Sequence, residues 1–285
     1  PPRSTLFPYT TLFRSGLHVV ASGAGGNMAL CVAEQGLLLV DTDYRALNEK
    51  LRAAIAGVSD KPVRVVVDTH WHFDHVEGNE AFARAGALIV AHENVRAKMA
   101  EARRIGIIDR EVPASPPEAL PAVTFRERLT LHWGGEEIEL LHCPGAHTDG
   151  DTVVRFKRAN VIHTGDIFFS AGYPFIEALG GGNVDGVIAA VKAILELCDE
   201  KTRIIPGHGP LARKQDLAVY GEMLAGVRAA VAKEMAAGKD LPAVIEARPT
   251  APYDEKWGRR AFPPEKFVEI VWHSLAGKIE APAVR

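Results

Sequence analysis

The chain has 285 residues, a formal net charge of −3, 47% apolar and 24% charged residues. This length and composition are typical of a globular protein whose core needs no disulfide staples. Scattered basic residues exclude a nucleic-acid footprint, and no run approaches the ~18 apolar residues of a spanning helix. Three widely spaced cysteines exclude a disulfide framework and a cysteine zinc knuckle. We therefore expect a protein that acts on a small molecule, without nucleic acid or membrane.

The first fifteen residues need separate treatment. Residues 5–15 read TLFPYTTLFRS, which matches the one-frame translation of a widely used DNA-sequencing adapter. We therefore predict that residues 1–15 are a non-native segment and that one domain occupies residues 16–285. The same match predicts a metagenome origin and a missing natural start, so the compartment stays open between bacterial periplasm and cytoplasm.

The first half of the chain alternates apolar runs of strand length with helical periodicity. Strands are predicted over 17–23, 27–34, 36–43, 63–70 and 87–92, and helices over 43–56, 79–85 and 92–104. The proline-rich, aperiodic segment that follows is predicted to be a loop over 105–120. It either shapes a substrate pocket, connects surface elements or makes a homodimer contact.

The second half repeats the arrangement. Strands are predicted over 128–133, 136–143 and 202–205, with a hairpin over 151–166 that turns near 158–160. Helices are predicted over 184–199, 213–237 and 264–276. Two facing sheets with helices outside are one of the few layered folds that fit this pattern.

Residues 69–75, THWHFDH, place three histidines and one aspartate directly after a buried strand. On an extended segment, side chains two residues apart point the same way, so His70 and His72 can bind one ion. Asp74 can reach a neighbouring position, and His75 falls outside the alternation and can serve a second ion. Imidazole and carboxylate suit zinc, with iron and manganese as alternatives.

Three further candidate ligands follow apolar runs and lie beside glycine: His147 in CPGAHTDGD, Asp166 in HTGDIFF and His208 in IIPGHGP. Glycine lets the backbone bend sharply, so side chains from separate strand ends can converge. We expect these residues and the THWHFDH cluster to meet at one edge of the sheets.

This ordered set resembles the metallo-β-lactamase superfamily over nearly all of residues 17–275. The resemblance implies an α/β fold, a four-layer αββα sandwich, with a dinuclear site for two Zn²⁺ ions at one edge. It implies that His70, His72 and His147 bind the first metal, that Asp74, His75 and His208 bind the second, and that Asp166 bridges them.

Other polar residues near strand ends have simpler interpretations. Asp41 and Asp68 are candidates to orient ligand imidazoles by hydrogen bonds, with turn or capping roles as equal alternatives. Asn183 is expected to cap the helix after it, and Asp149 and Asp151 to accept hydrogen bonds from nearby backbone. The remaining histidines are expected to be surface or hydrogen-bonded residues: His18, His92, His132, His142, His163 and His273.

The predicted chemistry is hydrolysis. Two metals a few Å apart lower the pKa of a bound water toward ~7, and the hydroxide attacks a carbonyl or phosphoryl centre. Asp74, the predicted catalytic residue, orients this hydroxide or takes its proton. The sequence thus predicts a zinc-dependent hydrolase that opens an activated cyclic amide or ester, with a β-lactam as first candidate.

Two positions bear on the substrate. By resemblance, Asp166 stands where clinical β-lactamases carry cysteine, and Phe169 stands where they often carry a lysine for the substrate carboxylate. The sequence around His147 nevertheless resembles the β-lactamase-like branch. A lactonase and a glyoxalase II-like thioester hydrolase are alternatives. Two further alternatives are an iron-dependent redox enzyme like persulfide dioxygenase, which by resemblance does not need Asp74, His75 or His208 as ligands, and a non-catalytic member.

Overall fold

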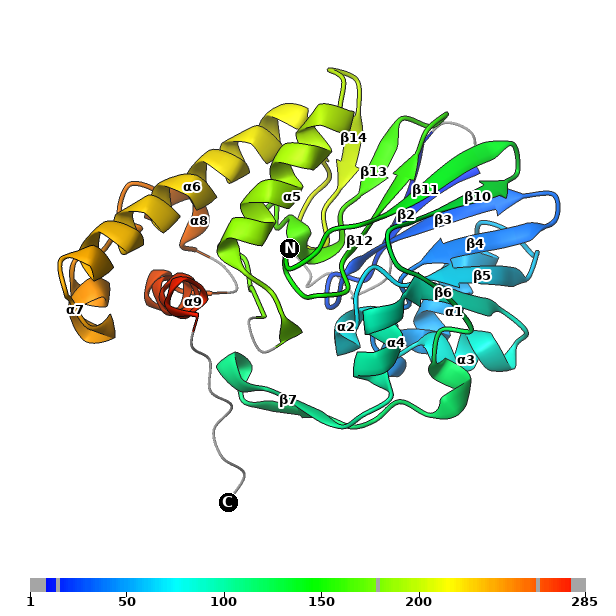
Figure 1. Ribbon diagram of the computed structural model, residues 1–285. Coiled ribbons are helices and arrows are strands. Elements are labelled where there is room, and N and C mark those ends of the chain that lie inside the picture. The colour runs from blue at the N-terminus through cyan, green and yellow to red at the C-terminus, as the bar shows by residue number, and fades with distance from the viewer. Residues whose placement is uncertain (1–8, 14–15, 178–179, 260–261, 278–285) are drawn as a thin grey trace, which may run out of the picture.

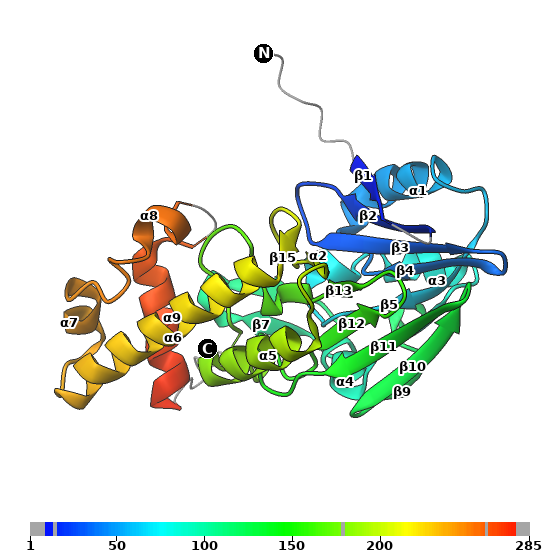
Figure 2. The ribbon, with the colours of Figure 1, turned by 90° about the horizontal axis from the view of Figure 1, so that it is seen from above.

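The structure is a computed structural model that describes residues 9–13, 16–177, 180–259 and 262–277. Two β-sheets lie face to face, with helices on both outer sides (Figures 1 and 2). The first sheet has, in spatial order, β1 (Tyr9–Leu12), β2 (Leu17–Ala21), β3 (Asn27–Ala33), β4 (Gly36–Val40), β5 (Val63–Val67), β6 (Leu88–His92) and β9 (Val123–Phe125). The second has β10 (Arg128–Trp133), β11 (Glu136–His142), β12 (Thr152–Phe156), β13 (Val161–His163), β14 (Arg203–Ile205) and β15 (Ala212–Arg213).

The helices form the two outer layers. Helices α1 (Asn48–Ala56) and α3 (Asn79–Arg84) cover the first sheet, and α5 (Val184–Leu197) and α6 (Lys214–Ala236) cover the second, with α9 (Pro264–Ala276) packed against α5 and α6. Shorter helices are α2 (Phe73–Val76), α4 (Glu93–Met99), α7 (Leu241–Glu246) and α8 (Asp254–Trp257). The predicted four-layer αββα sandwich is confirmed.

Strand β4 shows how the apolar runs divide between the layers. Side chains alternate across a strand, so an apolar strand that is buried on both faces contributes side chains to two cores. Leu37 and Leu39 pack with α1 and α3, whereas Leu38 and Val40 pack between the two sheets. All four are fully buried. Continuous apolar sequence therefore marks the strands in the middle of the sandwich.

The strand directions bring the polar strand ends to one edge. Strands β4, β5 and β6 run parallel to one another, and β13 runs parallel to β14. The carboxyl ends of parallel strands lie at the same edge of a sheet, where ligand sites are usually built. The loops after β5, β13 and β14 carry six of the candidate ligands, and His147 lies in the loop after β11, which runs in the same direction as β13 because both pair antiparallel with β12.

Some boundaries differ from the predictions. The helix predicted over 92–104 ends at Met99, and a strand β7 (Arg103–Ile105) follows it. The predicted loop over 105–120 contains β8 (Arg110–Val112), which pairs with β7 as a hairpin apart from both sheets. The helices α7 and α8 were not predicted because six and four residues are too few for a periodic pattern.

The boundary predicted at residue 16 remains a prediction. Strand β1 lies inside the first fifteen residues and pairs antiparallel with β2. Residues 1–8 and 14–15 lie outside the described residues. Within the described ranges, no helix combines the length and apolar character needed to cross a membrane.

We expect Leu38→Ala to lower the free energy of unfolding by about 2–5 kcal/mol, because it leaves a cavity between the sheets. Leu88→Ala, at a side chain that is 45% exposed, is the matched control and should change it by less than about 0.5 kcal/mol. Urea unfolding of both variants measures the difference. Equal effects would contradict the assignment of Leu38 to the inter-sheet core.

Candidate metal centre

The backbone of the THWHFDH motif changes direction inside the motif. His70 and His72 follow β5, and His72 is still extended with φ −67° and ψ 146°. At Phe73 the chain enters the helical turn α2, which carries Asp74 and His75. The extended backbone that places His70 and His72 on one side therefore ends at His72. Because of this turn, the side chains of Asp74 and His75 point toward a different position from those of His70 and His72.

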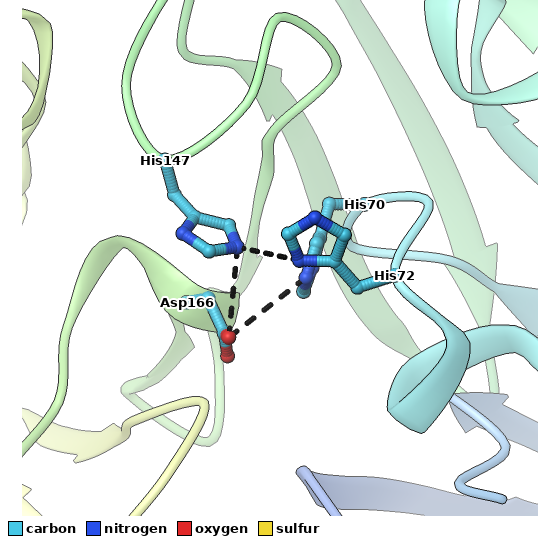
Figure 3. Close-up of side chains that lie close together, drawn as sticks. All are labelled: His70, His72, His147 and Asp166. Atoms are coloured by element: carbon cyan, nitrogen blue, oxygen red, sulfur yellow. Dashed lines mark hydrogen bonds and ion pairs between the residues drawn. The ribbon is translucent and has the colours of Figure 1, made fainter. Parts of the chain in front are cut away.

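Four buried side chains form a first group: His70, His72, His147 and Asp166 (Figure 3). One ligand atom from each lies within 4.8 Å of the others. The Nε2 atom of His147 is 2.9 Å from Nδ1 of His72 and 3.6 Å from Oδ2 of Asp166. Figure 3 shows the imidazoles and the carboxylate converging on one point from separate segments.

The second group consists of Asp74, His75 and His208. The Nε2 atom of His208 is 3.2 Å from Oδ2 of Asp74 and 3.4 Å from Nε2 of His75. Asp166 joins the two groups, because its Oδ1 is 3.2 Å from His75 Nε2 and its Oδ2 is 3.3 Å from His208 Nε2. All seven residues predicted as ligands therefore meet in one place, and the division into two groups matches the predicted one.

The outer hydrogen bonds indicate which ring nitrogens face the centre. Nδ1 of His147 lies 2.8 Å from the carbonyl oxygen of Phe175 and must donate to it. Nδ1 of His75 lies 2.8 Å from Oδ2 of Asp41, and Nδ1 of His70 lies 3.1 Å from Oγ1 of Thr69. We assign these protons to Nδ1, so that Nε2 of each ring faces the centre, with a lone pair in His70 and His147 and with a second proton in His75 until an ion binds. Metal-binding histidines need this arrangement.

The donor set fits divalent cations. The buried atom His70 Nε2 has no hydrogen-bond partner among the described residues. An unpaired buried polar atom is costly, and this one lies in a cluster of imidazole nitrogens and carboxylate oxygens. These are the ligand types of zinc, iron and manganese.

The carboxylate of Asp41, at the end of β4, is buried beside both groups. It accepts hydrogen bonds from the backbone N–H of Thr69 at 2.7 Å and from the Thr69 hydroxyl at 2.8 Å, besides its contact with His75. Thr69 in turn contacts His70. Asp41 thus reaches one histidine of each group, in the position expected of a residue that orients ligands.

Asp68 is connected to the candidate ligands only indirectly, through Asn79 and Thr42. Its Oδ2 accepts a hydrogen bond from Asn79 Nδ2 at 2.9 Å, and Asn79 Oδ1 accepts one from the Thr42 hydroxyl. The backbone N–H of Thr42 donates a hydrogen bond to the backbone oxygen of His75 at 2.7 Å. Burial raises the pKa of Asp68 well above its usual value, and the carboxylate of Asp41 raises it further. Asp68 supports the α2 backbone without touching a ligand imidazole.

Two glycines make the close approach of these segments feasible. A Cβ at Gly26 would lie 2.2 Å from the His75 ring, and one at Gly207 would lie 2.0 Å from Oδ1 of Asp166. Any side chain at either position would displace a candidate ligand.

The electrostatics divide the histidines into two classes. Burial lowers the pKa of His70, His72 and His147, so these imidazoles are neutral at pH 7. Burial also acts to lower the pKa of His75 and His208, but nearby carboxylates, with Asp166 the strongest, outweigh it. The pKa of His75 ends well above its usual value, and that of His208 rises to about 10.

The carboxylates show the reverse balance. Burial acts to raise the pKa of Asp74, and His75 and His208 outweigh it, so that the pKa ends below its usual value. For Asp166, burial is likewise outweighed by His208 and His75, and the pKa lies well below its usual value. In the absence of metal, these ion pairs stabilise the fold fully between the ordinary pKa values of 3.8 for Asp and 6.5 for His. The contribution is lost as pH rises through about 10, where His208 loses its proton, and as pH falls below 3.8 through the lowered pKa values of Asp74 and Asp166.

Aromatic rings cover one side of the centre. Phe175 lies 5.7 Å from His72 and 5.6 Å from His147 between ring centroids, and Phe169 stacks on His208 at 5.1 Å. Among the candidate ligands, only Asp74 and His208 have side chains more than 10% exposed, at 13% and 26%. A substrate therefore approaches from the side of these two residues.

The remaining polar residues lie where they were expected or nearby. Asn183 caps α5 by accepting a hydrogen bond from Asp185, and Asp151 accepts two from Thr148. His163 is buried and contacts the Asn27 carbonyl and the Gly165 N–H, which fixes the turn before Asp166. None of the other histidines expected to be non-ligands belongs to either group. Thr69 and the Phe175 carbonyl were missed, since no side-chain pattern marks them.

Comparisons with known proteins place this geometry in a family context. The sequence profile of the metallo-beta-lactamase superfamily matches residues 22–208. A probable metallo-hydrolase, YqgX, of Bacillus subtilis (strain 168) is 28% identical over 50% of this chain and 66% of its own length. A hydroxyacylglutathione hydrolase of Polaromonas sp. is 28% identical over 64% of this chain and 65% of its own.

Among solved structures, a double mutant of the sec-alkyl sulfatase PisA1, an enzyme from Pseudomonas sp., aligns with a TM-score of 0.74. It is 18% identical and covers 95% of this chain and 50% of its own. The chain thus spans about two thirds of the length of the two curated relatives above and half of the sulfatase. The structural likeness extends through the C-terminal helices, which lie beyond residue 208.

Zinc binding to the metal-free protein should release protons, because His75 and His208 are protonated at pH 7 and must lose them to bind an ion. We expect the apparent affinity to rise by about tenfold per pH unit for each proton released between pH 7 and 9. Calorimetric titration in two buffers of different protonation enthalpy counts the protons. An affinity independent of pH would contradict the assigned charges.

Replacing Asp41 by asparagine should lower zinc affinity by about 10–100-fold, because His75 and Thr69 lose an anionic acceptor. Asp68→Asn is the matched control, with a smaller effect, since Asp68 contacts no candidate ligand side chain. Competition with a chromophoric chelator measures both affinities. Equal losses would contradict the separate roles of the two aspartates.

Proposed function

We propose that this chain, which belongs to the metallo-β-lactamase superfamily, is a hydrolase that uses two divalent cations, zinc in the first place, to open an activated cyclic amide or ester. The observation that carries the proposal is the meeting of two complete ligand groups at Asp166. A β-lactam is the first candidate substrate.

The two groups of candidate ligands would each hold one cation. His70, His72 and His147 would hold one cation, Asp74, His75 and His208 the other, and Asp166 would contact both. When bound, two such ions supply a water-derived nucleophile at neutral pH and polarise the attacked carbonyl. The buried imidazoles keep bulk water away from the first position, since each is at most 3% exposed.

Asp74 is the proposed catalytic residue. Its carboxylate is partly exposed on the approach side, and its pKa is held below the usual range, so it is ionised and can accept a proton or orient a water molecule. Burial raises the pKa of Cys143 to about 12 and of Cys198 to about 11, so neither supplies a thiolate. Direct attack by water without a covalent enzyme intermediate is therefore the proposed route.

One observation favours thioester hydrolysis as a second candidate. The relative that covers 64% of this chain at 28% identity is named for the hydrolysis of hydroxyacylglutathione. The alternative of a mononuclear iron redox enzyme is disfavoured because Asp74, His75 and His208 form a second group that such an enzyme does not need. A non-catalytic role is disfavoured by the completeness of both groups.

Turnover of nitrocefin, benzylpenicillin, an acyl-homoserine lactone and a thioester, with zinc and iron content measured on the same sample, tests the proposal. We expect hydrolysis of at least one substrate, lost with a chelator and restored by zinc. No β-lactam turnover at full zinc occupancy would contradict the first substrate. No turnover of any member of the set would contradict the proposed reaction class.

We expect Asp74→Asn to lower kcat by about 100-fold or more, because the proton acceptor is lost. Asp185→Asn, an exposed carboxylate paired with Arg228, is the control and should leave kcat unchanged. Steady-state kinetics with metal analysis separates a loss of chemistry from a loss of metal. Unchanged kcat in Asp74→Asn would show that another group takes the proton or that the activity belongs to a contaminant.

A further inference from the structure

One irregular segment, residues 168–177, lies against candidate ligands of both groups. The ring of Phe169 stacks on that of His208, and the ring of Phe175 lies 5.6 Å from that of His147. The carbonyl oxygen of Phe175 also accepts the hydrogen bond from His147 Nδ1. The segment forms no helix, and its single β-bridge joins Phe169 to His208. Because it lacks a backbone ladder of its own, contacts from other elements must hold it in place.

The contacts that hold this segment converge on Tyr173 and come from the C-terminal helices. The backbone N–H of Tyr173 donates to the carbonyl oxygen of Trp257, the last residue of α8, at 3.0 Å. Its ring stacks on that of Phe267, in α9, with centroids 4.7 Å apart. Its hydroxyl lies 2.9 Å from Asp254 Oδ1 and 3.3 Å from the carbonyl oxygen of Thr250. Tyr173 is fully buried and is thus bound by its backbone, its ring and its hydroxyl together.

The hydroxyl of Tyr173 has one proton for these two acceptors. The Asp254 oxygen is the nearer one and belongs to a carboxylate, so we assign the proton to that hydrogen bond. Burial raises the pKa of Tyr173, and the hydrogen bond to Asp254 raises it further, so the hydroxyl stays protonated at neutral pH. Asp254 also pairs with Arg248 at 3.3 Å and is 18% exposed. Removing the hydroxyl therefore leaves no unpaired buried charge.

Pro174 connects the anchored Tyr173 to Phe175 by a stiff link. A proline ring fixes its own φ near about −65°, and the residue before a proline is confined to extended backbone. Few rotations are therefore left between the Tyr173 ring and the Phe175 carbonyl. Phe262 adds a second contact from the C-terminal part of the chain, because its ring stacks on that of Phe175 at 5.5 Å. The hydrogen bond that orients His147 thus depends on residues far from it in sequence.

Helix α6 supports the other end of the segment. The ring of Tyr220, in α6, lies 4.9 Å from that of Phe168 and 5.6 Å from that of Trp257. Figures 1 and 2 show α6, α8 and α9 together at one side of the sandwich. All candidate ligands lie within the residues that the family profile matches, 22–208, whereas these helices follow them in the chain.

We propose that Tyr173 is a positioning residue for the metal centre. Its anchorage on α8 and α9 holds, through Pro174, the Phe175 carbonyl that directs the His147 imidazole toward the first ion. The C-terminal helices thereby set the affinity of a site to which they contribute no ligand. This inference rests on the metal centre of the proposed function, and it is independent of the substrate and of the reaction.

Three variants separate this role from a general effect on stability. Tyr173→Phe removes the hydroxyl and keeps the ring that stacks on Phe267. Asp254→Ala removes the acceptor at a partly exposed position, and it decides the question by the same criteria if Tyr173→Phe does not fold. Tyr253→Phe is the matched control, because its hydroxyl belongs to the same part of the chain but lies against Gly226 of α6.

Two quantities are measured on the unchanged chain and on each variant. Exchange of the His147 Nδ1 proton with water is followed by NMR with isotope-labelled histidine, in the metal-free and the zinc-loaded protein. The affinities for the two zinc ions are measured by competition with a chromophoric chelator. Urea unfolding of the same samples reports global stability.

In Tyr173→Phe we expect the His147 proton to exchange about tenfold faster and one zinc affinity to fall by about tenfold, with the other unchanged. Asp254→Ala should act in the same direction by less, because the Thr250 carbonyl remains as an acceptor. Tyr253→Phe should change neither quantity. A general loss of stability would weaken both ions alike. Equal losses for the two ions, or an unchanged exchange rate in Tyr173→Phe, would overturn the proposal.

The two proposals can fail separately. If no zinc binds to the unchanged chain, the proposed function is wrong, and the exchange rate in the metal-free protein still decides whether Tyr173 holds His147. If zinc binds and substrate is hydrolysed while all variants exchange alike, the function stands and the role of Tyr173 is refuted.

Discussion

The carboxylate of Asp166 is the contact on which the site depends. It lies in the loop after β13, in the second sheet, yet its two oxygens lie beside histidines carried by both sheets. The site therefore exists only if the two sheets pack at one fixed separation and offset. The inter-sheet core, which includes Leu38, Val154 and Phe156, sets that offset by close packing. The packing of the sheets that buries these apolar side chains therefore also brings the candidate ligands together.

The layers and the seven candidate ligands could be predicted from the sequence for identifiable reasons. A strand buried on both faces appears as a continuous apolar run, as in β4, and the THWHFDH motif follows the buried end of β5 closely. The order of His70, Asp166 and His208 along the chain adds a resemblance that extends over most of the chain. These signals are local in sequence, so they can be recognised without knowledge of how the sheets pack.

Other features have no local signature. The turn at Phe73, after which the chain directs Asp74 to a different point from His72, depends on burial of Phe73 and Val76 in a core cluster shared with α4. The hydrogen bond from His147 to the Phe175 carbonyl involves a backbone atom that every residue has. The hairpin of β7 and β8 was hidden because strands of three residues are shorter than any reliable period, and its stability comes from the burial of Ile105.

The hairpin of β7 and β8 is structurally separate from the elements that carry the candidate ligands. The candidate ligands are carried by the loops of the two sheets, and a change in those loops would disturb several of them together. The hairpin belongs to neither sheet. Its exposed side chains can be exchanged while the sandwich keeps its register. The sequence of the hairpin and that of the candidate metal centre can therefore vary independently, both in natural divergence and in laboratory evolution of this scaffold.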